Sequence, residues 1–209
     1  MRTKEKKCKQ CGNKFSPSNS FQKTCSVVCA IEFGKKEVVK ETKKAWSVEK
    51  KQRLEKLKSH GDYENELQPL INKIARLIDK DEPCISCNKM AKKPQGGHRF
   101  SVGSNNSIRF NLHNIGIQCY KCNSELSGNP DGYDEGLVRV YGKDYFEYIK
   151  FELKLAYPIV KLTIPELITA RAKAMKIVKE LEKSDEVYSA EQRIKLRTEL
   201  NKQIGIYDN

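Results

Sequence analysis

Every one of the eight cysteines in this chain has a second cysteine close by, with two or three residues between the partners. Thiolates bind Zn²⁺ strongly, and two such pairs can close a tetrahedral four-thiolate site with Zn–S distances of about 2.3 Å. Such a site is structural, because no position is left for a reactive water. Disulfides are the alternative, but they suit short secreted chains. This chain has 209 residues, and because its basic N-terminus lacks an apolar segment we expect no export signal. The predicted zinc ligands are Cys8, Cys11, Cys25 and Cys29 in a first set, and Cys84, Cys87, Cys119 and Cys122 in a second.

The positive charge of the chain is concentrated in its first part. Residues 1–58 carry 17 Lys and Arg against 6 Asp and Glu, so they hold +11 of the net charge of +13. DNA is the partner expected for such a surface, because a nucleic-acid backbone is the commonest polyanion in a cell. A membrane surface is the rival, but the basic stretch lacks a strong apolar face, and no run of about 18 apolar residues occurs. We therefore expect a cytoplasmic protein without a membrane partner.

Four segments follow one another along the chain. Residues 1–34 hold the first cysteine set and are predicted to form a small zinc finger, which is too short to fold without its metal. Residues 35–60 are predicted to be a charged basic helical linker, which either serves as an exposed spacer or lies along a nucleic-acid backbone. Residues 61–155 contain the second cysteine set, and residues 156–209 are predicted to form C-terminal helices.

The predicted fold class is α+β and mostly helical. Apolar residues recur at steps of three and four over about 63–79, which predicts an amphipathic helix that serves core packing, with Pro69 in or near its first turn. The segment Ser59–Asp62 before it is expected to be a turn. Capping boxes that begin at Thr163 and Ser189 predict two helices near the C-terminus.

The segment between the two cysteine pairs of the second set carries residues suited to catalysis. His98 follows two glycines in the expected first strand of a hairpin, and Asn123 directly follows the last cysteine. A neutral imidazole can take a proton from water near physiological pH. The amide oxygen of Asn123 suits Mg²⁺, or Mn²⁺ in its place, which would stabilise charge on a scissile phosphate. The pattern indicates a ββα-metal nuclease core, stabilised by zinc and wrapped by helices.

Two further residues complete the predicted site. Asn114 is placed to clamp the hairpin loop and orient His98, and Arg109 could contact a phosphate oxygen as a bidentate donor. Simpler alternatives stay open: Asn123 could cap the helix that starts there, Asn114 could satisfy a turn, and Arg109 could be a surface charge. His98 is not needed as a zinc ligand, because four thiols already fill that site. His113 is expected in a loop and has no assigned role.

The order of these motifs resembles a known family. The segments CISC, GGHR and RFNLHNIGIQCYKCNSELSGN resemble the NinG (Rap) family of phage recombination proteins over roughly residues 63–182. They resemble more loosely the HNH, or His-Me finger, nucleases, including endonuclease VII of T-even phages. The resemblance implies that His98 is the general base, Asn123 the catalytic metal ligand and Asn114 the middle Asn of HNH. It further implies hydrolysis of branched DNA, such as Holliday junctions or D-loops, in the host cytoplasm.

One position departs from this pattern. Endonuclease VII-like sites have an Asp directly before the base, where this chain has Gly97, so water or phosphate oxygens are expected in place of a second protein ligand. A homodimer is a further option, because a junction-resolving enzyme cuts two opposed strands. The alternative function is a non-catalytic zinc-finger protein that binds DNA or mediates recombination. A protein-interaction adaptor is a third, which the charge of residues 1–58 argues against.

Overall fold

The computed structural model describes residues 4–207 and separates the chain into two compact units, which divide between Lys58 and Ser59. The second unit takes in both of the predicted segments 61–155 and 156–209, so the C-terminal helices belong to the same compact body as the second cysteine set. Among the described residues, no helix combines the length and the apolar character that crossing a membrane requires.

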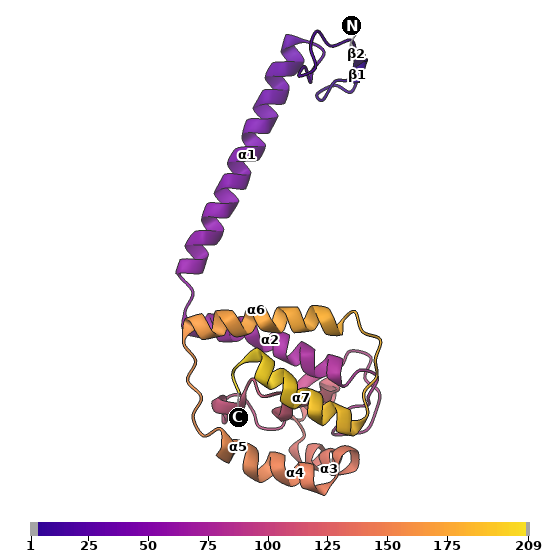
Figure 1. Cartoon of the computed structure of the whole chain (residues 1–209), viewed down its shortest axis with the longest axis vertical. Coiled ribbons are helices and arrows are strands. Elements are labelled where there is room, and N and C mark those ends of the chain that lie inside the picture. Colours follow the sequence, from indigo (N-terminus) through magenta and orange to yellow (C-terminus); the bar gives the residue numbers. More distant parts are fainter. Residues whose placement is uncertain (1–3, 208–209) are drawn as a thin grey trace. The chain divides into compact units, whose positions relative to one another are not determined.

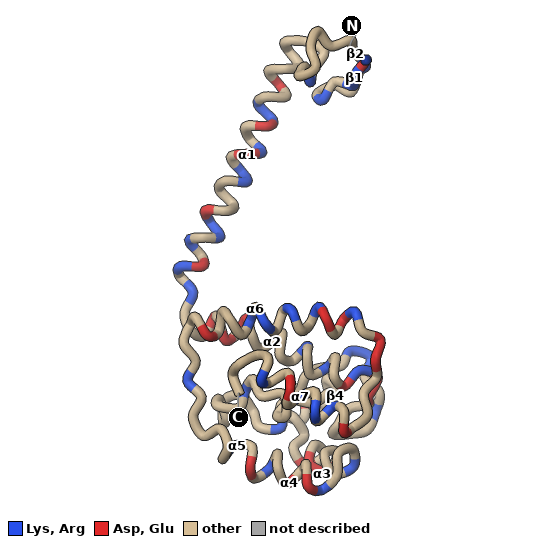
Figure 2. The backbone as a smooth tube through the Cα atoms, viewed as in Figure 1, with Lys and Arg blue, Asp and Glu red and all other residues tan. Residues whose placement is uncertain are grey.

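The first unit consists of a two-stranded antiparallel sheet and one long helix. Strand β1 (Lys6–Lys7) pairs with β2 (Lys14–Phe15), and α1 spans Val27–Lys56 (Figure 1). The side chain of Ser26 caps α1 by accepting a hydrogen bond from the backbone N–H of Cys29. No side chain of α1 is buried. From Lys35 onward, Lys and Arg recur along the helix among scattered acidic residues (Figure 2), so this part of α1 presents a charged and accessible surface.

The second unit begins with α2 (His60–Ile78), which starts earlier than predicted. Ser59 and Asp62 form a reciprocal capping box that opens this helix, so the predicted turn at this point is wrong. Pro69 consequently lies in the helix interior rather than in the first turn. The proline is tolerated there because it lies on the exposed side of α2, as does Asn65, whose carbonyl loses its helical partner and can bond water instead.

A two-stranded antiparallel hairpin follows the first cysteine pair of the second set. In its register, Gln95 lies opposite Gln118 and His98 lies opposite Ile115, so His98 lies in the first strand as predicted and is its last residue. Two 3₁₀ turns occupy the connection between the strands, and a short π-helical segment follows the second strand. These elements are β3 (Gln95–His98), η1 (Asn106–Ile108), η2 (Leu112–Asn114), β4 (Ile115–Gln118) and η3 (Lys121–Glu125).

Helices make up most of the remaining chain. Thr163 and Ser189 are the N-caps of the last two helices and form capping boxes with the residues three positions on, which confirms both predicted starts. The helices are α3 (Pro130–Tyr141), α4 (Lys143–Glu147), the π-helical η4 (Tyr148–Glu152), α5 (Leu153–Ala156), α6 (Ile164–Leu181) and α7 (Ala190–Ile204). Over residues 4–207 the fold is thus mostly helical with two small sheets, in agreement with the predicted class.

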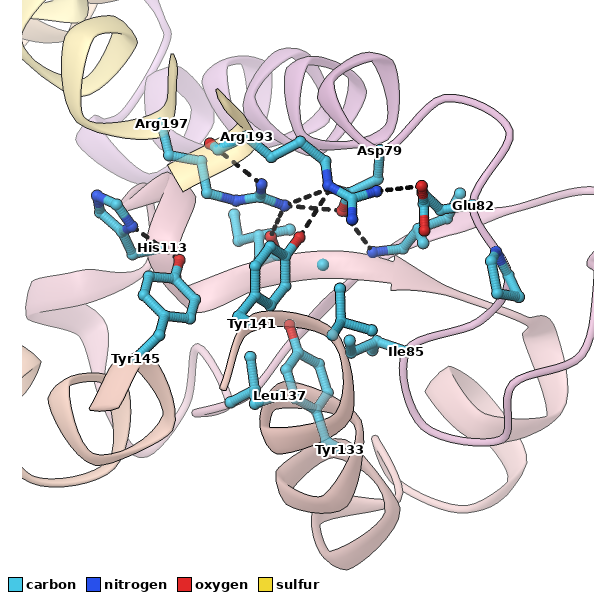
Figure 3. Close-up of a pocket in the computed structure, with 15 residues that line it drawn as sticks. Asp79, Glu82, Ile85, His113, Tyr133, Leu137, Tyr141, Tyr145, Arg193 and Arg197 are labelled. Atoms are coloured by element: carbon cyan, nitrogen blue, oxygen red, sulfur yellow. Dashed lines mark hydrogen bonds and ion pairs between the residues drawn. The ribbon is translucent and has the colours of Figure 1, made fainter. Parts of the chain in front are cut away.

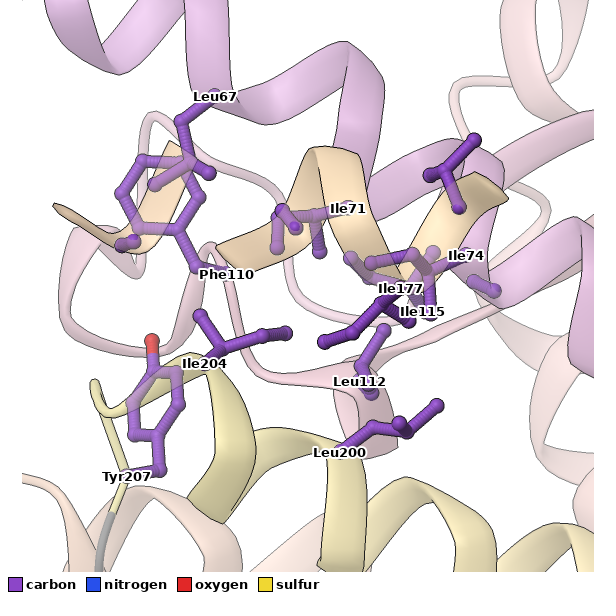
Figure 4. Packing of buried hydrophobic residues seen from close by; sticks show 14 of the residues in the cluster. Leu67, Ile71, Ile74, Phe110, Leu112, Ile115, Ile177, Leu200, Ile204 and Tyr207 are labelled. Atoms are coloured by element: carbon purple, nitrogen blue, oxygen red, sulfur yellow. The ribbon is translucent and has the colours of Figure 1, made fainter. Parts of the chain in front are cut away.

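Two apolar clusters hold the second unit together. The larger lies between α2, α6 and α7, where Leu67, Ile71 and Ile74 of α2 meet Ile177 of α6 and Leu200 of α7 (Figure 4). Each fully buried side chain of this size stabilises the fold by roughly 1.5–3 kcal/mol relative to an exposed one. The smaller cluster joins α3, α4, η4 and α5 to the segments around the second cysteine set. The hairpin contacts helices of both groups, since Gly96 of β3 lies against Asn72 of α2 and Gly116 of β4 lies against Tyr133 of α3.

Candidate functional site

The eight cysteines gather into the two predicted sets of four. Within each set, the four sulfur atoms lie within 4.8 Å of one another. The Sγ atoms of Cys11 and Cys25 are 3.6 Å apart, and those of Cys87 and Cys119 are 3.8 Å apart. These separations match the edge of a tetrahedron with Zn–S distances of about 2.3 Å, which is about 3.8 Å. They far exceed the ~2.05 Å of a disulfide bond, and all eight cysteines are free. Each cluster could therefore bind zinc.

The second cluster ties the hairpin to the chain that precedes it. One cysteine pair comes before β3 and the other comes after β4. The backbone N–H of Ile85, inside the first pair, donates to the carbonyl of Ile117 on β4 at 2.9 Å. Cys84 and Cys122 are buried. A metal ion held here would fix both ends of the hairpin and take no part in a reaction, because four protein ligands fill its coordination shell.

Packing requires the two glycines that precede His98. A β-carbon at Gly96 would lie 2.9 Å from the β-carbon and 3.0 Å from the α-carbon of Asn72 on α2, so the helix could not approach the strand. A β-carbon at Gly97 would lie 1.8 Å from Oε1 of Gln118, whose side chain is fully buried. Gln118 therefore occupies the space that an Asp at position 97 would need, which explains the departure from the endonuclease VII-like pattern.

The imidazole of His98 faces α2. Its Nε2 lies 2.9 Å from the carbonyl oxygen of Arg109 and 3.2 Å from Nε2 of Gln68. A carbonyl oxygen can only accept, so Nε2 carries the proton and Nδ1 carries the lone pair. Burial lowers the pKa of His98; the hydrogen bond to the Arg109 carbonyl opposes this, and the charge of the Arg109 guanidinium adds to it. His98 is therefore neutral at physiological pH, which is the state that a general base requires.

Helix α2 contributes polar side chains to this site, although the sequence predicted only core packing for it. Glu64, Gln68 and Asn72 recur at every fourth position and so lie along one edge of the helix. Nε2 of Gln68 donates to Oδ1 of Asn72 at 2.9 Å. The spacing of these polar residues beside the apolar face was the signal that could have revealed them.

The side chain of Arg109 faces the protein interior instead of a substrate. Its Nη1 lies 3.0 Å from Oε2 of Glu64, its Nε lies 3.2 Å from Oε1 of Gln68, and its guanidinium lies over the ring of Phe110. The residue is 8% exposed. Because Glu64 already pairs with the guanidinium, the structure does not present Arg109 for the predicted phosphate contact. Its backbone carbonyl, rather than its side chain, meets His98.

Asn114 clamps the loop between the strands. Its side chain is fully buried, and Oδ1 accepts the backbone N–H of Phe100 at 2.8 Å. Nδ2 donates to the carbonyls of Phe100 at 3.0 Å and Ile108 at 3.3 Å. These bonds join the residues just after His98 to the residue just before Arg109. Asn114 therefore holds the loop that carries the carbonyl partner of His98.

Asn123 lies in the middle of η3 rather than at a helix start. Its Nδ2 donates to Oε1 of Gln95 at 2.8 Å, and its Oδ1 has no protein partner among the residues that the structure describes. Side chains alternate along a strand, so Gln95 lies on the face of β3 opposite to His98. No hydrogen bond among the described residues joins His98 to Asn123. The predicted base and the predicted metal ligand thus have different neighbours: His98 contacts Gln68 of α2, and Asn123 contacts Gln95 of β3.

A buried polar cluster joins α7 to the end of α2 (Figure 3). Asp79 and Arg197 form a buried ion pair at 2.7 Å. The hydroxyl of Tyr141 donates to Asp79 at 3.3 Å, and the backbone N–H of Ile117 donates to it at 3.1 Å. The cluster borders a cavity of about 20 Å³, which is room for about one water. None of the predicted catalytic residues lines this cavity, so the cluster is structural.

His113 is buried beside this cluster. Its Nδ1 lies 2.9 Å from the hydroxyl of Tyr145, and its Nε2 lies 3.2 Å from Oγ1 of Thr198. Burial lowers the pKa of His113 to about 3, with help from the positive charge of Arg197. His113 is therefore a neutral structural histidine.

Comparison with known proteins gives a consistent family match. The family model described as NinG, the bacteriophage Lambda NinG protein, matches residues 1–186. Protein ninG of Escherichia phage lambda is 28% identical over 196 residues, which cover 86% of this chain and 94% of that protein. Protein ninG of Escherichia phage 933W is 28% identical over 194 residues with the same coverage, and that of Salmonella phage P22 is 28% identical over 154 residues, 66% of this chain and 76% of that protein. No solved structure shows significant similarity to the chain.

Proposed function

Because the chain belongs to the NinG family of phage proteins, we propose that it is a metal-dependent DNA endonuclease that acts on branched DNA during phage recombination. The observation that carries this proposal is the state of His98. The residue ends a hairpin strand beside a four-cysteine cluster, and its Nε2–H is committed to the carbonyl of Arg109. Its Nδ1 then carries a lone pair, which is what the activation of a water molecule requires.

In the proposed reaction, Nδ1 of His98 takes a proton from water while the water oxygen bonds to phosphorus and the bond to the 3′ oxygen breaks. The departing 3′ oxygen takes a proton from solvent and leaves as a 3′ hydroxyl, the phosphate stays on the 5′ side, and the proton on His98 returns to solvent. Mg²⁺ or Mn²⁺, when bound at Oδ1 of Asn123, would supply charge stabilisation at the phosphate and the departing 3′ oxygen. Asn123 suits such an ion because its Nδ2 already donates to Gln95, which leaves Oδ1 of the same amide available as a metal ligand.

The first unit supports DNA as the substrate. Residues 1–58 hold most of the positive charge of the chain, and the Lys and Arg side chains of α1, which run from Lys35 to Lys56, are exposed. Cations on such a surface bind phosphates by releasing counterions, independently of base sequence. A homodimer would supply two cleavage sites for the two opposed strands of a junction.

A non-catalytic role in DNA binding or recombination mediation is the second candidate, and one observation favours it. His98 contacts Gln68 on α2, whereas Asn123 contacts Gln95 on the opposite face of the strand. In a one-metal nuclease, base and metal ligand must reach the same phosphate, and a mediator has no such requirement.

Cleavage of a synthetic four-way junction, measured beside a linear duplex of the same sequence, separates the two functions. Protein with its zinc retained is incubated with Mg²⁺, with Mn²⁺, or with neither; the metals are omitted rather than chelated, so that the cysteine clusters stay loaded. The nuclease proposal expects nicks near the branch point only with an added metal. Tight binding of the junction without nicks under all three conditions would support the mediator role instead.

A further inference from the structure

We infer that Gln68 is a positioning residue that fixes the tautomer and the orientation of His98. Gln68 lies on α2 and holds Arg109 at two points: its Oε1 accepts from Nε of Arg109 at 3.2 Å, and its Nε2 donates to the carbonyl of Arg109 at 3.3 Å. The same carbonyl lies 2.9 Å from Nε2 of His98. The inference rests on the proposed function in one respect, because the position of His98 affects a reaction rate only if His98 is the base.

Only one orientation of the Gln68 amide satisfies its neighbours. Nε of Arg109 can only donate, so it must face the amide oxygen. The amide nitrogen then faces Oδ1 of Asn72 at 2.9 Å and the carbonyl of Arg109. Its two protons are both used in this way, one on each acceptor. Gln68 therefore has no proton left to give to His98.

Only one protonation state of His98 is consistent with its contacts to Gln68 and to the carbonyl of Arg109. If Nε2 of His98 lacked a proton, its lone pair would face the lone pairs of the Arg109 oxygen at 2.9 Å, which is repulsive. With the proton on Nε2, His98 and Gln68 both donate to that oxygen and fill its two acceptor positions. The proton therefore stays on Nε2, and Nδ1 remains the basic nitrogen.

The carbonyl of Arg109 cannot move away easily, because the far end of the side chain is also held. Nη1 of Arg109 pairs with Oε2 of Glu64 at 3.0 Å, and the side chain is 10% exposed. Glu64 and Gln68 are one turn apart on α2, so one face of a rigid helix holds both the main chain and the side chain of Arg109. Helix α2 thereby sets the position of the oxygen that orients His98.

Nuclear magnetic resonance of the zinc-loaded full chain, labelled with ¹⁵N-histidine, tests this inference. The chain has three histidines, and long-range ¹H–¹⁵N correlations report which ring nitrogen carries the proton. The His98 signals are assigned by their loss in His98→Gln. We expect the Nε2–H tautomer in the unmodified protein. Gln68→Met keeps the bulk of the side chain but removes both hydrogen bonds to Arg109, so the Arg109 carbonyl loses the only one of these contacts made to the main chain, and we expect a mixture of tautomers. The matched control is Gln203→Met, at an exposed glutamine of α7, and should leave His98 unchanged.

The isosteric Gln68→Glu is a second variant. It also tests the inference if changes in circular dichroism or zinc content show that Gln68→Met does not fold correctly. Its carboxylate can accept from Nε of Arg109 and from Nε2–H of His98 but cannot donate to the carbonyl. The Nε2–H tautomer should therefore persist while the pKa of His98 rises, which a ¹⁵N titration measures. An unchanged pKa would contradict the contact.

Single-turnover cleavage of a four-way junction gives the functional readout. Gln68→Met should cleave roughly 10- to 100-fold more slowly with unchanged DNA affinity, and Gln203→Met should cleave at the normal rate. An unaltered Nε2–H tautomer in a correctly folded Gln68→Met protein would overturn the inference, whatever its rate. If no protein cleaves, the unmodified one included, the proposed nuclease function fails, and the tautomer still decides whether Gln68 positions His98.

Discussion

In the first unit of the chain, a four-cysteine cluster stands almost without an apolar core, whereas in the second unit a cluster of the same kind lies beside two apolar clusters. No described residue of the first unit belongs to either apolar cluster, and no side chain of α1 is buried. In the second unit, α2, α6 and α7 pack around buried aliphatic side chains, and no cysteine of the second set belongs to that cluster. The same ligand set can thus be the main source of folding energy in one unit and a local clamp in the other.

Removal of zinc should unfold the first unit and leave the core of the second unit folded, and this is the largest effect that we expect. Elemental analysis should give two zinc ions per chain in protein purified without added metal. After chelation, hydrogen exchange should show that β1 and β2 lose protection completely, while the amides of α2 and α6 stay protected by the apolar core.

Two outcomes would contradict this comparison. A content near one zinc ion per chain would mean that one of the two cysteine clusters is not a zinc site. Loss of protection in α2 and α6 on chelation would mean that the second unit depends on metal as strongly as the first. Cys25→Ser and Cys122→Ser form a matched pair, since each removes one ligand from one cluster.

Breaking the buried ion pair of the second unit should have the next largest effect, because the first unit has no counterpart to it among its described residues. Arg197→Met leaves the carboxylate of Asp79 buried without its cation and should lower the free energy of unfolding by about 3–5 kcal/mol. Urea denaturation measures the change. The control is Lys176→Met on the exposed surface of α6, which should change stability by less than about 0.5 kcal/mol. Equal effects of the two substitutions would show that the pair is not important for the second unit.

Deletion of residues 1–58 tests whether the first unit holds DNA while the second performs chemistry. Binding to junction and duplex should weaken together, and the dependence of log K on log salt should flatten by about 0.9 for each phosphate that the protein no longer neutralises. The remaining chain should still cleave at low salt. If sedimentation instead shows that the deletion turns a dimer into a monomer, and the salt dependence stays the same, then the segment joins protomers and does not follow the DNA backbone.

The buried His113 should make the stability of the second unit depend slightly on pH. Its pKa is about 3 in the folded protein, against an ordinary value of 6.5. Between these pH values the unfolded chain binds a proton at His113 that the folded chain does not. The contribution of His113 to stability is therefore fully present above pH 6.5 and decreases as the pH falls below it. The loss is at most about 1.4 kcal/mol per pH unit.

The contribution of His113 to this pH dependence is measured by urea denaturation of the unmodified protein and of His113→Gln at pH 6.5 and pH 5.5. The stability of His113→Gln should fall less between the two pH values. His60→Gln, at a histidine whose side chain is 47% exposed, is the control. A pH dependence that is the same for the His113→Gln variant and the unmodified protein would show that His113 titrates normally in the folded state.

Local signals in the sequence predicted much of the architecture. The cysteine spacing placed both four-sulfur clusters, and Thr163 and Ser189 placed the starts of α6 and α7. A capping box is a short-range device, so it can be recognised without knowledge of the fold. The capping box at Ser59 was missed: Ser59–Asp62 was predicted to be a turn, whereas Ser59 and Asp62 cap the start of α2.

Features that depend on distant residues could not be predicted in this way. The direction of the Arg109 side chain is set by Glu64, which is 45 positions earlier in the chain. The absence of an Asp at position 97 is explained by the buried Gln118, which lies opposite Gln95 in the register and fills the space over Gly97. The spacing of residues in the sequence predicts neither contact. The first arises only when the loop of the hairpin packs against α2, and the second only when β3 pairs with β4.

The central claim is that the second unit contains a nuclease whose general base is His98, and one measurement tests it most directly. Single-turnover cleavage of a four-way junction with Mg²⁺ is measured for the unmodified protein, for His98→Ala, and for His60→Ala as the matched histidine control, with zinc content and junction binding determined on the same samples. We expect His98→Ala to cleave about 10²- to 10⁴-fold more slowly while zinc content and binding stay normal, and His60→Ala to cleave normally. Cleavage by a zinc-loaded His98→Ala protein at the unmodified rate would contradict the claim.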